Sequence, residues 1–179
     1  MTFTQSLIEA IARRDHGIMR KVHRWPAPRW IRWWMVSSTR GGDGWLWGLL
    51  GLVLLLSGGP DRFHAVGEAS VASALGILAF RYLKRVTGRR RPCVLEPHCW
   101  STLLPPDQFS FPSGHTITAF AVITPVSLYY PDALPVLLFC AASVAISRVV
   151  LGMHFLSDVV AGATIGAALG VVVHSLQVF

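Results

Sequence analysis

The segment Ser147–Asp158, SRVVLGMHFLSD, joins two long apolar runs and places an arginine, a histidine and a carboxylate close together in the chain. The run before it, Ala133–Val150, and the run after it, Phe155–Val178, consist largely of Leu, Val, Ala and Gly. Apolar runs that approach ~20 residues are long enough to cross a bilayer as helices. The segment therefore predicts a junction between two membrane-spanning helices, with polar side chains where lipid meets water.

The composition of the whole chain is typical of a membrane protein. Hydrophobic residues make up 53% of its 179 residues, charged residues only 14%, and the mean hydropathy is +0.50. Soluble domains usually carry about a quarter charged residues. The length is that of a single domain, residues 1–179, and no internal repeat or linker is visible.

The formal net charge of +7 is compatible with two kinds of partner. A basic surface can bind nucleic acid, or it can meet membrane headgroups and an anionic substrate. The apolar runs favour the second interpretation, so membrane lipids and no nucleic acid are expected as partners.

Five apolar runs are candidates for membrane spans, and together they predict an all-α, integral-membrane helical bundle. They are Trp45–Ser57, Phe63–Leu83, Thr116–Tyr130, Ala133–Val150 and Phe155–Val178. Several are short for the full thickness of the hydrocarbon layer, so neighbouring polar residues are expected to continue the same helices.

The first forty residues predict an interfacial segment. Thr4–Lys21 has apolar residues at helical spacing with charges between them, which indicates an amphipathic helix lying on the membrane. Trp25–Trp34 is rich in Trp, Pro and Arg and is expected at the headgroup level. A surface loop packed on the bundle is the alternative for this second stretch.

Three short strings, all within residues 84–158, carry the polar chemistry. They are Lys84-x6-Arg91-Pro92, Pro112-Ser113-Gly114-His115 and Ser147-Arg148-x5-His154-x3-Asp158. Following the chain through the spans places the end of the second, the start of the third, the end of the fourth and the start of the fifth at one membrane face. The three strings are therefore expected to form one site.

The cations and small residues of this site are suited to a phosphate group. Arg91 and Arg148 can each present a planar fork to phosphate oxygens, and Lys84 adds a point charge. Ser113 can donate its hydroxyl, while Gly114 lets the backbone approach closely. A helix that starts at these residues directs free N–H groups toward an anion.

His154, Asp158 and His115 supply the groups needed for covalent phosphoryl transfer. On a helix, His154 and Asp158 would share one face, so that the carboxylate fixes the tautomer and the other ring nitrogen attacks phosphorus. His115 would protonate the leaving oxygen and later take a proton from water. The same three side chains could instead bind zinc or iron. Two arginines and a lysine would compete with such an ion, so no metal and no cofactor are expected.

Taken together, the three strings resemble the signature of the type-2 phosphatidate phosphatase superfamily. This family includes bacterial lipid phosphatases, polyprenyl-pyrophosphate phosphatases, glucose-6-phosphatase and vanadium haloperoxidases. The resemblance implies a six-helix core, with His154 as nucleophile, Asp158 as its partner and His115 as acid. It also implies that phosphate is held by Lys84, Arg91, Ser113, Gly114 and Arg148, with Ser147 as a small residue beside that arginine. The chain departs from the family in offering about five spans plus an amphipathic segment.

The expected activity is metal-independent hydrolysis of a lipid phosphate or pyrophosphate through a phosphohistidine. Phosphatidate, phosphatidylglycerophosphate, undecaprenyl pyrophosphate and lipid A are candidate substrates. A lipid phosphotransferase with the same intermediate is the alternative. A non-catalytic lipid-phosphate binder or transporter is a third possibility, which the pairing of His154 with Asp158 argues against.

Two considerations disagree about which side of the membrane the site faces. Eight basic residues are expected on the same side as the site, and a positive-inside count would make that side cytoplasmic: Arg13, Arg14, Arg20, Lys21, Arg24, Arg29, Arg32 and Arg40. Bacterial relatives generally place the site in the periplasm. An inner-membrane protein with a periplasmic site is therefore the expectation.

Three further features are left with two interpretations each. Arg89 and Arg90 could hold a second phosphate or meet lipid headgroups. Cys93 and Cys99 flank one polar loop and could pair or stay as free thiols. Glu68 lies in the second span and is either functional or a satisfied packing residue.

Overall fold

The computed structural model describes residues 3–95 and 107–177. Its helices are α1 (Phe3–His23), α2 (Arg29–Arg40), η1 (Gly41–Trp45), α3 (Leu46–Ser57), α4 (Arg62–Thr87), α5 (Pro92–Leu95), α6 (Gly114–Tyr129), η2 (Pro131–Ala133), α7 (Leu134–Val150) and α8 (Leu156–Ser175). In this described part the only extended pairing is an isolated bridge between Arg90 and Phe109. The prediction of an all-α fold is thus confirmed.

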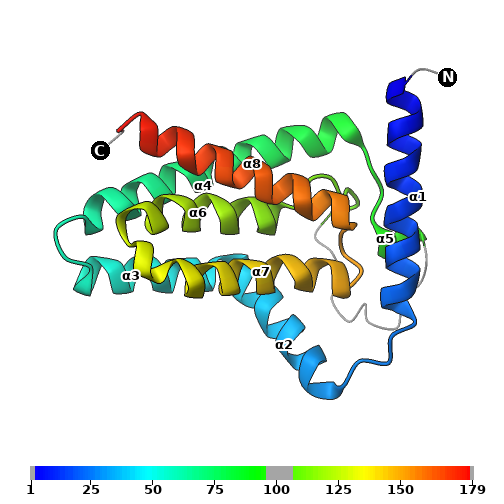
Figure 1. Cartoon of the computed structure of the whole chain (residues 1–179), viewed down its shortest axis with the longest axis horizontal. Coiled ribbons are helices and arrows are strands. Elements are labelled where there is room, and N and C mark those ends of the chain that lie inside the picture. Colours follow the sequence, from blue (N-terminus) through cyan, green and yellow to red (C-terminus); the bar gives the residue numbers. More distant parts are fainter. Residues whose placement is uncertain (1–2, 96–106, 178–179) are drawn as a thin grey trace.

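The longer helices run alongside one another, and the N-terminal helix stands across their ends (Figure 1). Helix α6 occupies the centre and contacts α4, α7 and α8. Helix α2 lies obliquely against α7 and continues through η1 into α3. The ends of α4 and α7 and the starts of α6 and α8 therefore meet at one end of the bundle, as the order of the spans predicts.

A line of glycines brings α8 against α6. A methyl group added at Gly162 would lie 2.9 Å from the carbonyl oxygen of Ser113, and one at Gly166 would overlap the carbonyl oxygen of Ile117. Small residues at this spacing let helices approach closely in lipid. The close approach also joins the starts of the two helices, because the backbone N–H of Ser113 donates to the carbonyl of Asp158 at 3.1 Å.

The outer surface of the bundle is suited to lipid. Three stretches in the described residues combine the length and the apolar composition needed to span a membrane: Arg62–Thr87, Pro131–Val150 and Leu156–Ser175. Helices α3 and α6 are apolar but shorter. Large apolar side chains such as Leu56, Leu78 and Phe139 project outward. An exposed apolar surface of this extent is expected where hydrocarbon replaces water.

The N-terminal segment contains two helices. Helix α1 matches the predicted amphipathic helix and exposes Leu7, Ile8 and Ile11. The stretch rich in Trp is helical from Arg29 onward, so the alternative of a surface loop is wrong for that part. Its Trp33 is 72% exposed, as a headgroup-level anchor requires.

At the far end of the bundle, Glu68 is fully buried and has polar partners. It accepts a hydrogen bond from the Tyr129 hydroxyl at 2.7 Å and lies 2.9 Å from Nδ1 of His174. The structure therefore places Glu68 in a satisfied cluster away from the predicted site.

Candidate active site

The three predicted strings meet around a cavity of about 460 Å³ at the end of the bundle that carries α1 and α2. Six of the predicted site residues line it: Lys84, Arg91, Gly114, His115, Arg148 and His154. Ser113 and Asp158 are fully buried and do not line the cavity. The arrangement brings three buried cations and two imidazoles to one space.

Lys84 and Arg91 hold a carboxylate between them. Oδ2 of Asp107 lies 2.7 Å from Nζ of Lys84, and Oδ1 lies 2.8 Å from Nη2 of Arg91. Burial by itself raises the pKa of Asp107, but the hydrogen bonds from Lys84 and Arg91 bring this pKa below its ordinary value. Asp107 is therefore an anion here, and the two cations are spaced to bind two oxygens of one acidic group.

Arg148 is the third cation and has few partners. Its side chain is 2% exposed, its Nη1 lies 3.4 Å from Thr39 Oγ1, and its Nε has no hydrogen-bond partner among the described residues. The neighbouring Ser147 hydroxyl lies 2.7 Å from that of Thr39 and is fully buried. Ser147 thus contacts Thr39, which in turn contacts Arg148. A buried guanidinium with unused donors favours an anion in the cavity.

His154 lies in the turn before α8, not on a helix face shared with Asp158 as the four-residue spacing suggested. Gly152 has a φ of 69°, which glycine adopts easily, and this reverses the chain after α7. The backbone N–H of His154 then donates to the carbonyl of Arg148 at 3.0 Å. The same turn therefore positions both the imidazole and the cation.

The neighbours of His154 determine its tautomer. Nη1 of Arg91 lies 3.0 Å from Nε2, and because a guanidinium only donates, Nε2 is the acceptor. The ring proton is then on Nδ1, which faces Oδ2 of Asp158 at 3.6 Å. Burial, followed by the charges of Arg148 and Arg91, lowers the pKa of His154. The imidazole is neutral, with its lone pair directed toward the cations.

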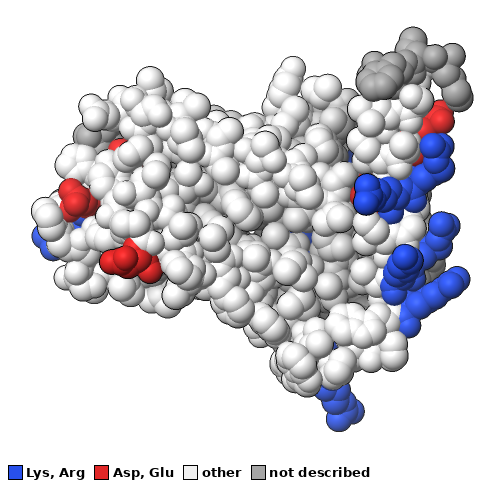
Figure 2. All heavy atoms as spheres, viewed as in Figure 1, with Lys and Arg blue, Asp and Glu red and all other residues white. Residues whose placement is uncertain are grey.

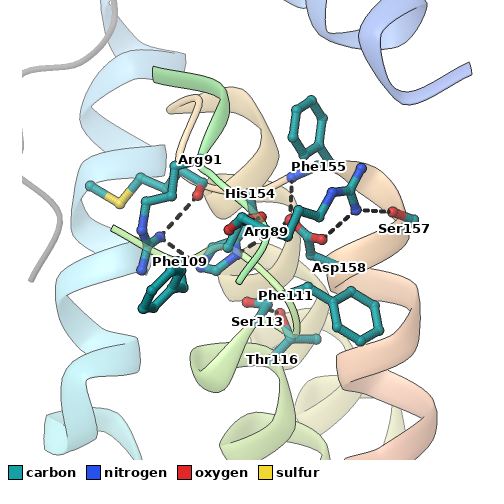
Figure 3. Close-up of polar contacts among 12 residues, drawn as sticks. Arg89, Arg91, Phe109, Phe111, Ser113, Thr116, His154, Phe155, Ser157 and Asp158 are labelled. Atoms are coloured by element: carbon teal, nitrogen blue, oxygen red, sulfur yellow. Dashed lines mark hydrogen bonds and ion pairs between the residues drawn. The ribbon is translucent and has the colours of Figure 1, made fainter. Parts of the chain in front are cut away.

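Asp158 is held on both of its oxygens. Oδ2 accepts the backbone N–H of Phe155 at 2.8 Å, and Oδ1 accepts Nη1 of Arg89 at 2.6 Å. Figure 3 shows Arg89 reaching both Asp158 and Ser157, with Arg91 and His154 on the other side of the carboxylate. The carboxylate is thereby fixed behind the imidazole, out of the cavity.

His115 lies in the first turn of α6 and pairs with a carboxylate from a distant part of the chain. Its Nε2 lies 2.6 Å from Oδ1 of Asp43, which belongs to η1. Gly42 allows this approach, because a methyl group there would lie 3.2 Å from the His115 ring and 2.7 Å from Val144. Gly44 has a φ of 122°, a conformation that glycine tolerates. The sequence Gly41–Trp45 is thus built to bring a carboxylate to His115.

Ser113 and Gly114 shape the start of α6 from opposite sides. The Ser113 hydroxyl accepts a hydrogen bond from Thr116 at 3.0 Å and is directed into the protein. A methyl group at Gly114 would lie 3.1 Å from the Phe80 ring, so a larger residue would need Phe80 to move. The structure therefore places the backbone of Gly114, and not the hydroxyl of Ser113, at the cavity.

One of the open alternatives has a structural answer. Arg89 binds Asp15 at 2.6 Å and Asp158 at 2.6 Å, so it serves neither a second phosphate nor a headgroup in this structure. Arg90 is exposed and does not line the cavity. Cys93 forms no disulfide with a described residue, and its possible partner Cys99 lies outside the described residues, so the pairing of these two cysteines stays open.

Sequence reasoning missed four residues around the site: Asp15, Asp43, Arg89 as an ion-pair partner, and Asp107. Three glycines around Asp43 were the only local signal for one of them. The others lack a pattern, because each acts through a contact between distant segments of the chain.

The fold and the site define a polytopic α-helical membrane enzyme with an anion-binding centre at one end of its bundle. Comparisons with known proteins agree. The family model described as the PAP2 superfamily matches residues 65–179. The chain is 36% identical over 150 residues to decaprenylphosphoryl-5-phosphoribose phosphatase of Mycobacterium tuberculosis, covering 79% of this chain and 80% of the relative. It is 31% identical to phosphatidylglycerophosphatase B of Bacillus subtilis, over 66% of this chain and 54% of the relative.

Two solved structures have the same fold. The first is LpxE of Aquifex aeolicus, with a TM-score of 0.74 and 25% identity, covering 89% of this chain and 93% of the other. The second is a transmembrane PAP2-type phosphatidylglycerolphosphate phosphatase of Bacillus subtilis, with a TM-score of 0.72 and 23% identity, covering 94% and 86%.

The chain belongs to the PAP2 superfamily. The prediction of this family and of a membrane enzyme of the phosphatase class is thereby confirmed.

Proposed function

We propose that the chain hydrolyses a lipid phosphate through a phosphohistidine on His154. The relatives are lipid and polyprenyl phosphate phosphatases, which supports hydrolysis of a phosphate carried by a lipid. One contact carries the proposal further: Nη1 of Arg91 lies 3.0 Å from Nε2 of His154. This contact supports the proposal, because the lone pair of a neutral imidazole would then be directed toward the cations that would hold the phosphate.

The first step transfers the phosphoryl group to the enzyme. Arg91, Arg148 and Lys84 neutralise the phosphate oxygens, and Gly114 offers backbone N–H groups at a helix start. Nε2 of His154 forms the bond to phosphorus as the bond from phosphorus to the lipid oxygen breaks. The bound phosphate monoanion first passes its proton to His115, whose imidazolium Asp43 stabilises at 2.6 Å. His115 then gives this proton to the lipid oxygen, and the lipid alcohol leaves.

The second step releases the phosphate. His115, now neutral, takes a proton from water as the water oxygen bonds to phosphorus and the bond to Nε2 breaks. The imidazole of His154 returns to its neutral form, with its remaining proton on Nδ1 facing Asp158. Inorganic phosphate leaves: the bond from Nε2 to phosphorus has been made and broken, and the bond from phosphorus to the lipid oxygen has been replaced by one to the oxygen of water. No step needs a metal ion, because three side chains already supply the positive charge.

The shape of the cavity suits a lipid better than a small soluble ester. Its inner wall contains Trp47, Ile77 and Phe80. A second, apolar cavity of about 210 Å³ between α3, α4 and α6 shares Trp47 and Ser73 with it. An acyl or polyprenyl chain would extend along this apolar wall while the phosphate stays among the cations.

The preferred substrate is a monophosphate. Of the basic run before Pro92, only Arg91 faces the cavity, because Arg89 is engaged by two carboxylates and Arg90 is exposed. A pyrophosphate would bring further negative charge that the lining cations do not match. The relative from Mycobacterium tuberculosis is named decaprenylphosphoryl-5-phosphoribose phosphatase. A polyprenyl-linked phosphosugar is therefore a further candidate substrate.

The site faces the periplasm at the inner membrane. The resemblance of the three strings to a family whose bacterial members generally place the site in the periplasm is the basis for this orientation. The basic residues on the same side can bind anionic headgroups on either face of a membrane, so they are compatible with it.

The test is phosphate release by purified protein in detergent micelles. The substrates are phosphatidate, phosphatidylglycerophosphate, decaprenylphosphoryl-5-phosphoribose and undecaprenyl pyrophosphate. We expect release from at least one monophosphate, no effect of EDTA, inhibition by vanadate, and slower turnover of the pyrophosphate. Loss of activity with EDTA, restored by added metal, would reject the metal-free mechanism. Transfer of phosphate to a lipid acceptor without release would establish the phosphotransferase instead.

A further inference from the structure

Helix α1 contributes a buried carboxylate to the back of the site. Asp15 lies on the face of this interfacial helix that meets the bundle, and it is 4% exposed. Its Oδ2 lies 2.6 Å from Nη2 of Arg89, and its Oδ1 accepts the backbone N–H of Ser157 at 3.1 Å. The Ser157 hydroxyl also donates to Oδ2. A buried carboxylate with three donors is an organised contact.

Arg89 connects this carboxylate to Asp158. Its Nη2 binds Asp15, while its Nη1 binds Oδ1 of Asp158 at 2.6 Å and Oγ of Ser157 at 2.7 Å. The guanidinium also lies 4.3 Å from the centre of the Phe155 ring. Its direction is therefore fixed on several sides, as Figure 3 shows for the contacts with Ser157 and Asp158.

Arg89 is one of the donors that fix the direction of the Asp158 carboxylate, together with the backbone of Phe155 and the side chain of Ser110. With Oδ1 bound by Arg89 and Oδ2 bound by the backbone of Phe155, Oδ2 is the oxygen that faces Nδ1 of His154. If Arg89 turned, Oδ1 would lose its charged donor, and the carboxylate would be held toward the imidazole less firmly, by Phe155 and Ser110 alone. The chain of contacts thus runs from Asp15 through Arg89 and Asp158 to His154.

From this geometry we infer that Asp15 and Arg89 are a positioning pair for Asp158, and that helix α1 thereby forms part of the catalytic apparatus. The inference rests on the proposed function, because it assigns a role in the reaction of His154. Asp15 touches no reacting atom and acts through Arg89. Its loss should weaken the chemical step and leave substrate binding largely intact.

A simpler role for Asp15 would be to dock α1 on the bundle. Docking has its own apolar contacts, because Met19 packs with Ala145, Val149, Phe155 and Val159. Both roles couple Asp15 to Arg89, because the two side chains are in contact. The two roles differ in one respect. Docking alone predicts that changing Asp15 lowers the stability of the protein with little change in kcat, whereas positioning predicts a fall in kcat at a nearly unchanged KM.

The experiment is a double-mutant cycle on full-length protein in detergent micelles, with the best lipid monophosphate as substrate. We expect Asp15→Asn to lower kcat about tenfold, in the range found for residues that orient a catalytic group, with KM changed less than about twofold. Arg89→Gln should lower kcat further. The combined variant should be no slower than Arg89→Gln alone. Glu9→Gln, which removes a carboxylate from the exposed face of the same helix, is the matched control and should keep wild-type kcat.

Wild-type kcat in Asp15→Asn, or effects of the two substitutions that multiply, would overturn the inference. Ser157→Ala keeps both ion pairs but removes the hydroxyl that joins them, and we expect a smaller fall in kcat in the same direction. If Asp15→Asn cannot be purified with native helix content, Ser157→Ala replaces it in the test. An unchanged kcat in Ser157→Ala would then contradict the inference. If the wild-type chain releases phosphate from none of the lipids, the proposed function fails, and this inference fails with it.

Discussion

At the residue scale, the reactivity of His154 depends on which protons its neighbours can donate. Arg91 offers only donors, so Nε2 must accept and the proton must be on Nδ1. This is the tautomer that a nucleophile requires, with the lone pair toward the cations and the N–H toward Asp158. A single guanidinium thus binds the anion and also orients the base that attacks it.

The protonation of His154 can be measured directly. Burial and the charges of Arg148 and Arg91 lower its pKa below the ordinary value of about 6.5. A lowered pKa means that the neutral form persists as the pH falls through 6.5. In ¹⁵N spectra of histidine-labelled protein, with the His154 signal assigned by a His154→Gln variant, we expect the ring to stay neutral at pH 6. A His154 signal that titrates at or above pH 6.5 would contradict the assigned environment.

The sequence predicted the residues of contiguous motifs better than the residues that only the tertiary structure brings together. Six of the eight predicted residues line the cavity. They do so because the three strings lie at the ends of spans that meet at one membrane face. Asp107 and Asp43 were not predicted, since nothing in their local sequence says which distant cation or imidazole they meet. Ser113 was expected to donate to phosphate, but its hydroxyl is buried against Thr116. The direction of a side chain at a helix start cannot be derived from spacing alone.

At the element scale, the site depends on where helices begin and end. Helix α6 starts at Gly114 and α8 at Leu156, and the glycine line from Gly162 to Gly170 brings the two starts together. The four-residue spacing of His154 and Asp158 predicted that they lie close together, but for the wrong reason. The turn at Gly152, and not a shared helix face, places the imidazole.

The N-terminal elements were the hardest to predict. The amphipathic pattern of α1 was clear, but Asp15 was one charge among several on that helix. The Trp, Arg and Gly residues of α2 and η1 do not follow a regular helical spacing of apolar residues. The sequence therefore did not predict that the chain continues from α2 through η1 into α3. Helix α1 contributes Asp15 and η1 contributes Asp43 to the surroundings of the site, and only the tertiary packing reveals these roles.

At the scale of the whole molecule, the distribution of charge is uneven. Figure 2 shows most visible Lys and Arg side chains gathered at the end that carries α1 and α2, where acidic atoms are few, and larger acidic patches toward the other end. All eight basic residues that were expected on the side of the site are exposed. They can bind anionic headgroups around the cavity mouth and raise the local concentration of a negatively charged lipid.

The orientation follows from labelling the two ends. In a variant with its three cysteines changed to serine, Arg13→Cys reports on the end with the site, and Asp132→Cys reports on η2 at the opposite end. Both native side chains are exposed. With a membrane-impermeant maleimide on intact spheroplasts, we expect label at position 13 and label at position 132 only after permeabilisation. The reverse pattern would place the site in the cytoplasm.

The central claim is that phosphate passes through the imidazole of His154. The most direct measurement is rapid acid-free quenching of enzyme mixed with a ³²P-labelled lipid monophosphate, followed by peptide mapping. We expect a base-stable, acid-labile label on the peptide that contains His154. The label should be absent in His154→Asn and retained in His174→Asn, whose histidine lies in the cluster at the far end of the bundle. Phosphate release without any labelled protein, or label on Ser113 or His115, would contradict it.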